Sequence, residues 1–290
     1  MVKLPSHLAR DNKIEYFADN TAVLVSKHKK EEAIAPVLQQ LNWQIKVYPL
    51  DTDQFGTFSG EIAREGTPLQ AARRKIAEAQ QKTPGTIWLA SEGSFGPHPE
   101  FSFLPMDHEL ILCYDAANDL EIIAEAMDTD TNYNREEINN WGQLEKFANT
   151  AGFPAHGLIL KGAKENTPLK IIKENNNLED LRHAYHQLQG YNISAETDMR
   201  ALYNPKRMQV IAKATQQLVE KIKSLCPNCQ TPGFWITENI PGLPCEWCNK
   251  PTQMVKSHVY QCQKCSHKEE KARKDGKEFA DPMYCNFCNP

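Results

Sequence analysis

Apolar and polar positions in residues 21–225 switch repeatedly between the two-residue period of strands and the 3.6-residue period of helices. Apolar side chains recur at helical spacing from Ile34 to Leu41, and Thr67 followed by Pro68 has the residue types that begin a helix. Strands that alternate with helices predict an α/β fold with a mixed sheet flanked by helices. Further helices are predicted from Asn134, as the capping residue, to Gly152, from Leu178 to Gln189 and from Asn204 to about Leu225, and strands at Thr21–Val25, Gln44–Leu50, Ile87–Ala90, Glu109–Asp115, Leu120–Glu125, Gly157–Lys161 and Leu169–Lys173.

The composition is that of a globular protein. Of the 290 residues, 40% are hydrophobic and 24% are charged, which excludes a disordered or collagen-like chain. No apolar run approaches the roughly 20 residues that a membrane-spanning helix needs, and the N-terminus lacks the apolar stretch of a signal peptide. We therefore expect a cytoplasmic protein that does not enter a membrane, with residues 1–20 as an N-terminal extension and residues 21–225 as the α/β domain.

Cysteine is the unusual component of the sequence. Of the nine cysteines, all except Cys113, which we expect in the core, form four Cys-x-x-Cys pairs in residues 226–288. In a reducing compartment such pairs are typical of metal sites, and two pairs supply the four thiolates of a closed tetrahedral zinc site. The predicted zinc ligands are Cys226, Cys229, Cys245, Cys248, Cys262, Cys265, Cys285 and Cys288.

The spacing of the pairs leaves two ways to combine them. In a sequential arrangement the first pair joins the second and the third joins the fourth. In a nested arrangement the middle two pairs form an inner site, and the outer two pairs close an outer one. We favour the nested arrangement, because the strand-like stretch Met254–Tyr260 delivers Cys262 to an inner site. Four thiolates leave no position for water, so both zinc ions are predicted to be structural, in a double zinc-ribbon-like domain at residues 226–290.

Aromatic residues and lysines are interleaved in this domain, a pattern found on surfaces that bind single-stranded RNA and also around small packed cores. Residues 221–290 hold 10 Lys and Arg against 7 Asp and Glu. Each zinc ion with four thiolates carries a formal charge of about −2, so two sites make this segment slightly negative. Contact with RNA therefore needs local clusters of lysine, because the overall charge does not attract a polyanion.

A phosphate site is predicted where the first strand leads into the first helix. Backbone N–H groups at a helix N-terminus, together with basic side chains, favour a bound anion. The candidate residues are Ser26, Lys27, His28 and Lys30.

Five carboxylates in the same domain have the chemistry that Mg²⁺ prefers, namely Asp51, Asp53, Glu92, Asp107 and Glu109. Glu92 follows a buried strand, so its backbone position is fixed, and Gly93 allows a close approach to a ligand. The Gly- and aromatic-rich stretches Asp53–Phe58 and Ser94–Pro99 are predicted to be ligand loops.

The whole chain resembles an uncharacterised bacterial family, a domain of unknown function that ends in paired cysteines. The resemblance rests on four strings of sequence, which imply no activity. They are residues 51–58 (DTDQFGTF), residues 91–99 (SEGSFGPHP), residues 196–200 with 204–208 (ETDMR and NPKRM), and the terminal Cys-x-x-Cys-Asn-Pro.

Residues 21–125 are also similar to inosine/xanthosine triphosphate pyrophosphatases, which have an α/β fold, a nucleotide cleft between two lobes and bound Mg²⁺. The resemblance lies in the turn after the first strand, the helix from Thr67 to Ala79 and the tryptophan strand that ends at Glu92. In the turn, His28 stands where the family has Asn, and Lys30 is one position early. The resemblance implies that Thr67 and Arg74 bind phosphate, that Glu92 is a metal-binding or catalytic acid, and that Arg200 or Arg207 binds the base or the phosphates.

The sequence thus predicts a Mg²⁺-dependent phosphohydrolase that acts on a nucleotide or a related phosphate-bearing small molecule, with Glu92, Asp53 and Asp107 as catalytic residues and with two structural zinc ions. The alternative is a ligand-sensing or adaptor protein without catalysis, whose zinc domain binds protein or RNA.

Overall fold

The computed structural model describes residues 16–51 and 65–289, and the chain forms two compact units. The first unit contains Phe17–Val219 and the second contains Glu220–Pro290. The predicted ligand residue Asp53, the predicted loop Asp53–Phe58 and most of the predicted N-terminal extension lie outside the described residues.

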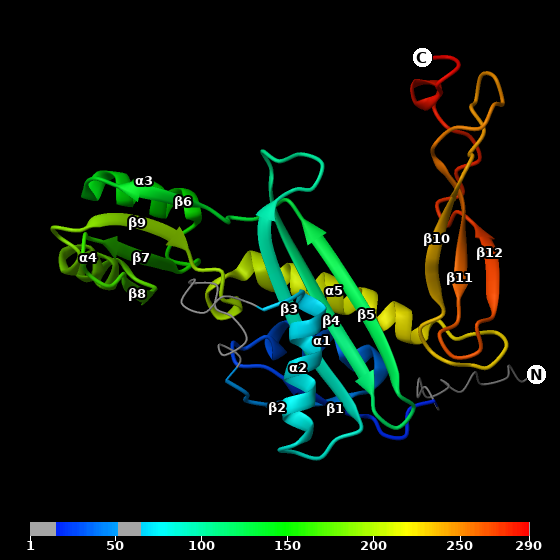
Figure 1. Ribbon diagram of the computed structural model, residues 1–290, viewed down its shortest axis with the longest axis horizontal. Helices are drawn as coiled ribbons and strands as arrows, with labels where there is room; N and C mark the ends of the chain where they lie inside the picture. Colours follow the sequence, from blue (N-terminus) through cyan, green and yellow to red (C-terminus); the bar gives the residue numbers. More distant parts are fainter. Residues whose placement is uncertain (1–15, 52–64, 290) are drawn as a thin grey trace, which may run out of the picture. The chain divides into compact units, whose positions relative to one another are not determined.

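The first unit is built around a five-stranded sheet in the order β2-β1-β3-β4-β5 (Figure 1). The parallel strands β1, β2 and β3 carry the βαβ connections, whereas β4 and β5 continue the sheet as antiparallel strands. The predicted mixed sheet is therefore confirmed. The strands span Thr21–Val25 (β1), Gln44–Tyr48 (β2), Ile87–Pro97 (β3), Pro105–Asp115 (β4) and Leu120–Asp128 (β5).

Two helices connect the parallel strands of this sheet. Helix α1 (Glu31–Leu38) leads from β1 to β2, and α2 (Pro68–Gln80) leads from β2 back past β1 to β3. The order of the strands changes direction between β1 and β3, because α1 leads from β1 to β2 on one side and β3 is followed by β4 on the other. Open α/β sheets place their ligands at such a point, outside the carboxyl ends of the strands. Apolar side chains of α2 pack onto one face of the sheet, against Trp88 and Leu110 among others.

Strand β3 is longer than the sequence indicated. The prediction ended it at Ala90 and made Ser94–Pro99 a ligand loop, but β3 runs on to Pro97. Residues 91–97 pair with β4 in continuous antiparallel register, for example Ser94 with His108, so β4 satisfies their backbone groups. A polar, glycine-containing composition does not stop a strand when a long partner strand lies beside it.

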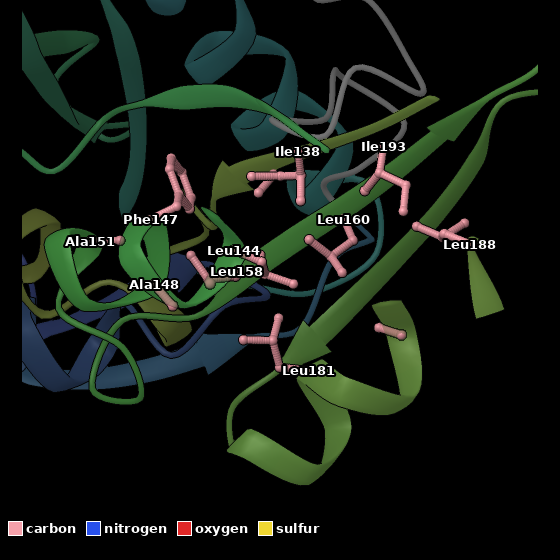
Figure 2. Packing of buried hydrophobic residues seen from close by; sticks show 12 residues of the cluster. Ile138, Leu144, Phe147, Ala148, Ala151, Leu158, Leu160, Leu181, Leu188 and Ile193 are labelled. Atoms are coloured by element: carbon pink, nitrogen blue, oxygen red, sulfur yellow. The ribbon is translucent and has the colours of Figure 1, made fainter. Parts of the chain in front are cut away.

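A second, antiparallel sheet in the first unit has the order β6-β9-β7-β8 and is covered by two helices. The predicted single sheet is thus divided in two. Figure 2 shows how apolar side chains of α3, α4 and the strands meet in one core that includes Leu144, Leu160 and Leu181. The elements are β6 (Arg135–Ile138), α3 (Trp141–Ala151), β7 (Leu158–Ala163), β8 (Lys170–Asn175), α4 (Leu178–Gln187) and β9 (Asn192–Thr197).

The start of α3 corrects one prediction. Its capping residue is Asn140, whose side chain accepts a hydrogen bond from the backbone N–H of Gln143. The predicted cap, Asn134, instead precedes β6, and its backbone N–H donates to the side-chain hydroxyl of Thr197 at the end of β9. Both asparagines have the side chain that caps a helix, and tertiary pairing with β9 decides between them. The predicted end of the helix at Gly152 is confirmed, because this residue adopts a left-handed conformation with φ of 82°.

Helix α5 (Pro205–Lys223) follows the cap region at Asn204, as predicted. In the first unit it packs along β5, where Lys206 pairs with Asp130 and Lys213 pairs with Asp128. The second unit contains a three-stranded antiparallel sheet of β10 (Trp235–Pro241), β11 (Val255–Gln261) and β12 (Lys268–Ala272). None of the helices in the described ranges is long and apolar enough to span a membrane.

Candidate functional site

The eight paired cysteines form two clusters in the second unit, and the pairing is interleaved. The first and third pairs form one cluster, Cys226, Cys229, Cys262 and Cys265, and the second and fourth pairs form the other, Cys245, Cys248, Cys285 and Cys288. Within each cluster all four sulfur atoms lie within 4.8 Å of one another. Four thiolates at this separation fit one tetrahedral metal ion such as zinc.

This arrangement differs from both predicted ones. The predicted strand is present as β11, but it pairs with β10 and so delivers Cys262 to the cluster of Cys226, not to that of Cys245. The Sγ atoms of Cys226 and Cys265 are 3.6 Å apart, as are those of Cys229 and Cys262. The chain then crosses back, and the isolated bridge of Cys245 with Ala280 brings the last pair to the second cluster. Strand pairing, which the Cys spacing does not encode, decides the combination.

A group of buried charged residues lies in the first unit beyond the carboxyl end of β1. Strand β1 pairs with β3 only as far as Val25 and Ala90, so the edge of β3 beyond Ala90 has no strand partner among the described residues. Side chains from α1, α2, β3, β4 and α5 meet there. They are Lys30, Lys75, Glu92, Asp107, Glu109 and Arg207, and all six are buried. We refer to them as the charge cluster.

Lys30 reaches from the start of α1 to the open edge of β3. Its Nζ donates to the backbone oxygen and to the Oγ of Ser91, each at 3.0 Å. Burial, and secondly the positive charge of Arg207, lower the pKa of Lys30 to about 7. The ammonium group is therefore held by uncharged oxygen atoms at a position where a bound anion would stabilise it.

Two ion pairs lie on opposite faces of the sheet beside Lys30. Because side chains alternate along a strand, Glu92 points to the face covered by α2, where it pairs with Lys75. Glu109 points to the other face, where its Oε1 is 2.6 Å from Nε of Arg207 on α5. Nη1 of Arg207 also donates to the backbone oxygen of Met199. Each face of the sheet thus carries one cation and one carboxylate of the cluster.

Asp107 is the carboxyl group of the cluster that lacks a cationic hydrogen-bond partner among the described residues. It is 1% exposed, and its Oδ1 has no hydrogen-bond partner in that part of the chain. Burial, and secondly the negative charge of Glu109, raise its pKa to about 8. At neutral pH this carboxyl group is largely protonated, and a nearby cation would favour its ionised form.

An aromatic ring links the charge cluster to a pocket. The guanidinium carbon of Arg207 lies 5.3 Å from the ring centroid of Phe95, and the ring of Phe95 stacks on Tyr133 at 5.8 Å. Tyr133 lines a pocket of about 590 Å³, together with the end of the β3–β4 hairpin, including Phe103, and with Asn132. The pocket has the apolar and amide groups that suit a planar organic ring.

Of the predicted site residues that the structure describes, four lie together. Lys30, Glu92, Asp107 and Arg207 belong to the charge cluster, and Ser26 is buried at the end of β1. The other predicted ligands have different surroundings. Lys27 is paired with Asp51, His28 is half-buried, Thr67 caps α2 through the backbone N–H of Gln70, Arg74 donates to the backbone oxygen of Glu65, and Arg200 is paired with Asp198.

Lys75 was not predicted as a ligand, and Glu109 was named among the candidate carboxylates but was assigned no catalytic role. The signal for Lys75 was its position, because it lies among Ala72, Ile76 and Ala79 on the apolar face of α2. A lysine on a buried helical face needs a partner, and Glu92 supplies it. The signal for Glu109 was the alternation of β4, which places it on the inward face with Ile111.

Comparison with known proteins identifies a family without naming an activity. A search of curated proteins finds no match. The sequence model of a family described as Domain of unknown function (DUF6671) matches residues 75–290, a span that runs from Lys75 through β3, β4 and α5 to both cysteine clusters. Because this span is most of the chain, the protein belongs to the DUF6671 family.

Proposed function

We propose that the first unit is a Mg²⁺-dependent phosphohydrolase that acts on a nucleotide or a related phosphate ligand at the charge cluster. The observation that carries the proposal is the position of Lys30, a buried amino group held by uncharged atoms of Ser91 just beyond the carboxyl end of β1. This is where open α/β sheets bind ligands. With Asp107 protonated, Lys75 and Arg207 balance Glu92 and Glu109. The pKa of Lys30 is about 7, so the protonated form of Lys30 adds a positive charge that a bound anion would stabilise.

Lys30, Lys75 and Arg207 would contact the phosphate groups of the ligand and stabilise negative charge that develops on them during hydrolysis. Lys75 and Arg207 would exchange their carboxylate partners for phosphate oxygens, which are equally good acceptors. Binding of an anion would also raise the pKa of Lys30 and keep its ammonium group charged.

The carboxylates of the cluster fit Mg²⁺, which takes one or two carboxylate ligands together with substrate phosphates and water. Glu109 is close enough to raise the pKa of Asp107, and the unpartnered Oδ1 of Asp107 is a free donor atom for a cation. Glu92 lies on the face of the sheet that α2 covers. It would orient or activate a water molecule once Lys75 contacts the phosphate instead of Glu92. When bound, Mg²⁺ would polarise the phosphate oxygens.

Phosphate release in the presence of Mg²⁺ tests this proposal. Inosine, xanthosine and the standard nucleoside triphosphates are offered as substrates, with and without added inorganic pyrophosphatase to distinguish phosphate from pyrophosphate as product. We expect release by the wild type that falls by at least about a hundredfold in Asp107→Asn and Glu92→Gln. The matched control is Arg73→Gln, because Arg73 is exposed and bound to Glu121. Equal release from all proteins, or none from the wild type, would contradict the proposal.

We also propose that both cysteine clusters bind structural zinc. The support is the donor set, four thiolates at each site, which matches zinc and leaves no open coordination position. Free thiolates of this kind persist in a reducing compartment, which favours the cytoplasm.

An adaptor role for the second unit is a second candidate function. It is favoured by large apolar side chains that lie exposed around the second cysteine cluster, such as Trp247 and Phe287. This role does not depend on hydrolysis by the first unit.

A further inference from the structure

The four Cys-x-x-Cys turns of the second unit differ at one equivalent position. The residue before the second cysteine is Asn228 or Lys264 in the first cluster, but Trp247 or Phe287 in the second. Trp247 is 75% exposed and Phe287 is 59% exposed. The polar residues show that this position does not require an aromatic side chain, so the two exposed rings are not explained by the metal sites.

The surroundings of the two rings extend the apolar surface. Met283 and Tyr284, in the turn before Cys285, are also more than half exposed. The aromatic residues that form the small core of this unit lie elsewhere, because Phe234 and Tyr260 are buried beside the first cluster. An apolar patch that a core does not use is typical of an interaction surface. We call residues 242–254 and 276–289, which contain this patch, the aromatic lobe.

The charge of the aromatic lobe excludes a polyanion as its preferred partner. Its carboxylates are Glu246, Glu278 and Asp281, and its cations are Lys250 and Lys277. A divalent metal ion on four thiolates adds a further formal charge of about −2. The lysine-rich part of the second unit is separate, and there Lys271 and Lys274 lie over the rings of Tyr260 and Trp235. Most lysines of the second unit therefore lie outside the aromatic lobe, which contains only Lys250 and Lys277.

The lobe itself shows the contact that a cationic partner would make. Nζ of Lys250 lies 3.9 Å from the centroid of the Phe287 ring. Aromatic rings flanked by carboxylates attract ammonium and guanidinium groups, and the apolar parts of the same surface accept aliphatic side chains. A second copy of the chain would bring two lobes of like charge together, which disfavours a symmetric contact.

We propose that the aromatic lobe binds a basic segment of another protein, in which Arg or Lys side chains stack on Trp247 and Phe287 and apolar residues pack beside them. This role is independent of the phosphohydrolase activity proposed for the first unit.

Selection from a phage library of random short peptides against the full-length, metal-loaded protein tests the proposal. The expected winners carry a net positive charge and at least one apolar residue, and synthetic winners bind with a dissociation constant in the range of about 1–100 μM. Trp247→Ala/Phe287→Ala is expected to weaken their binding by at least about tenfold. Asn228→Ala/Lys264→Ala, altered at the equivalent positions of the first cluster, is the matched control and is expected to bind as the wild type does.

Several outcomes would overturn the proposal. They are the selection of acidic or uncharged peptides, no enrichment over the Trp247→Ala/Phe287→Ala protein, and equal loss of binding in the control. Tighter binding of oligouridylate RNA than of the selected peptides would assign the lobe to nucleic acid instead. Self-association in sedimentation experiments, abolished by Trp247→Ala/Phe287→Ala, would assign it to a second copy. Retained metal content in both variants shows that the loss of binding is not caused by unfolding.

Discussion

Gly93 lies beneath the ion pair between Arg207 and Glu109, and the absence of a side chain there allows the pair to form. A Cβ atom at this position would lie 2.2 Å from Oε1 of Glu109 and 2.6 Å from Nη2 of Arg207. We predict that Gly93→Ala lowers the free energy of unfolding by about 1–3 kcal/mol, because a buried pair must move. Denaturant titration measures this change. Gly96→Ala in the same strand is the control, since a Cβ there meets nothing within 4 Å; equal losses in both variants would contradict the prediction.

Asp107 predicts a pH dependence of stability. Its pKa is raised from the ordinary 3.8 to about 8, so the folded protein holds a proton that the unfolded chain releases between these values, and stability falls as the pH rises through this window. Asp107→Asn should therefore lose less stability than the wild type between about pH 5 and pH 8, as measured by denaturant titration.

Lys30 provides the control for this experiment, because its shifted pKa changes the stability with pH in the opposite direction. Its pKa is lowered from 10.5 to about 7, so above pH 7 the unfolded chain binds the extra proton and stability rises with pH. Lys30→Met should remove that rise and keep the decline at lower pH. An unchanged decline in Asp107→Asn would show that Asp107 does not titrate as described.

The sequence predicted the kinds of side chain in the charge cluster better than it predicted which individual residues belong to it. Lys30, Glu92 and Asp107 were predicted from residue type and position and belong to the charge cluster. Arg74 was predicted because the expected resemblance to pyrophosphatases places it at that family's Arg position. Burial on the face of α2 decides instead that its neighbour Lys75 reaches Glu92. Thr67, predicted to bind phosphate, has its side-chain oxygen occupied in the capping box with Gln70.

Among the elements, those with a strong local signal were predicted well. Strand β1 and the beginning of α2 were predicted from an apolar run and from a Thr-Pro cap, both of which are local features. The elements that were wrong or missed depend on partners far along the chain. The extension of β3 requires β4, and β9, which was not predicted, is held between β6 and β7.

The interleaved combination of cysteine pairs makes a prediction that metal analysis can decide. Replacing the first and third pairs by serine removes one complete cluster, so the protein should retain about one zinc ion. Replacing the first and second pairs leaves half of each cluster, and the protein should lose both ions from tight binding. In the sequential arrangement the first variant would retain no zinc and the second variant would retain one ion. In the nested arrangement both variants would retain none. Elemental analysis after dialysis distinguishes the three arrangements.

The distribution of charged side chains within the two units was the property that the sequence predicted least well. The sequence count assigns a slight positive balance to residues 221–290, but the cysteine clusters and their surroundings separate an anionic aromatic lobe from a lysine-rich sheet. In the first unit, six charged side chains are buried together beyond the carboxyl end of β1, so the net charge of the sequence does not reveal them. The proposed roles of the two units follow this division, because we propose a small anion as the ligand of the first unit and a basic protein segment as the partner of the second.

Calorimetric titration with inorganic pyrophosphate in the presence of Mg²⁺ tests whether the charge cluster binds an anion. We expect the wild type to bind pyrophosphate, and we expect Lys75→Gln to bind it about tenfold or more weakly, which corresponds to about 1.4 kcal/mol. Arg73→Gln, which changes an exposed arginine of the same helix, should bind as the wild type does. Absence of binding by the wild type, or equal affinities of the two variants, would show that the charge cluster is not an anion site.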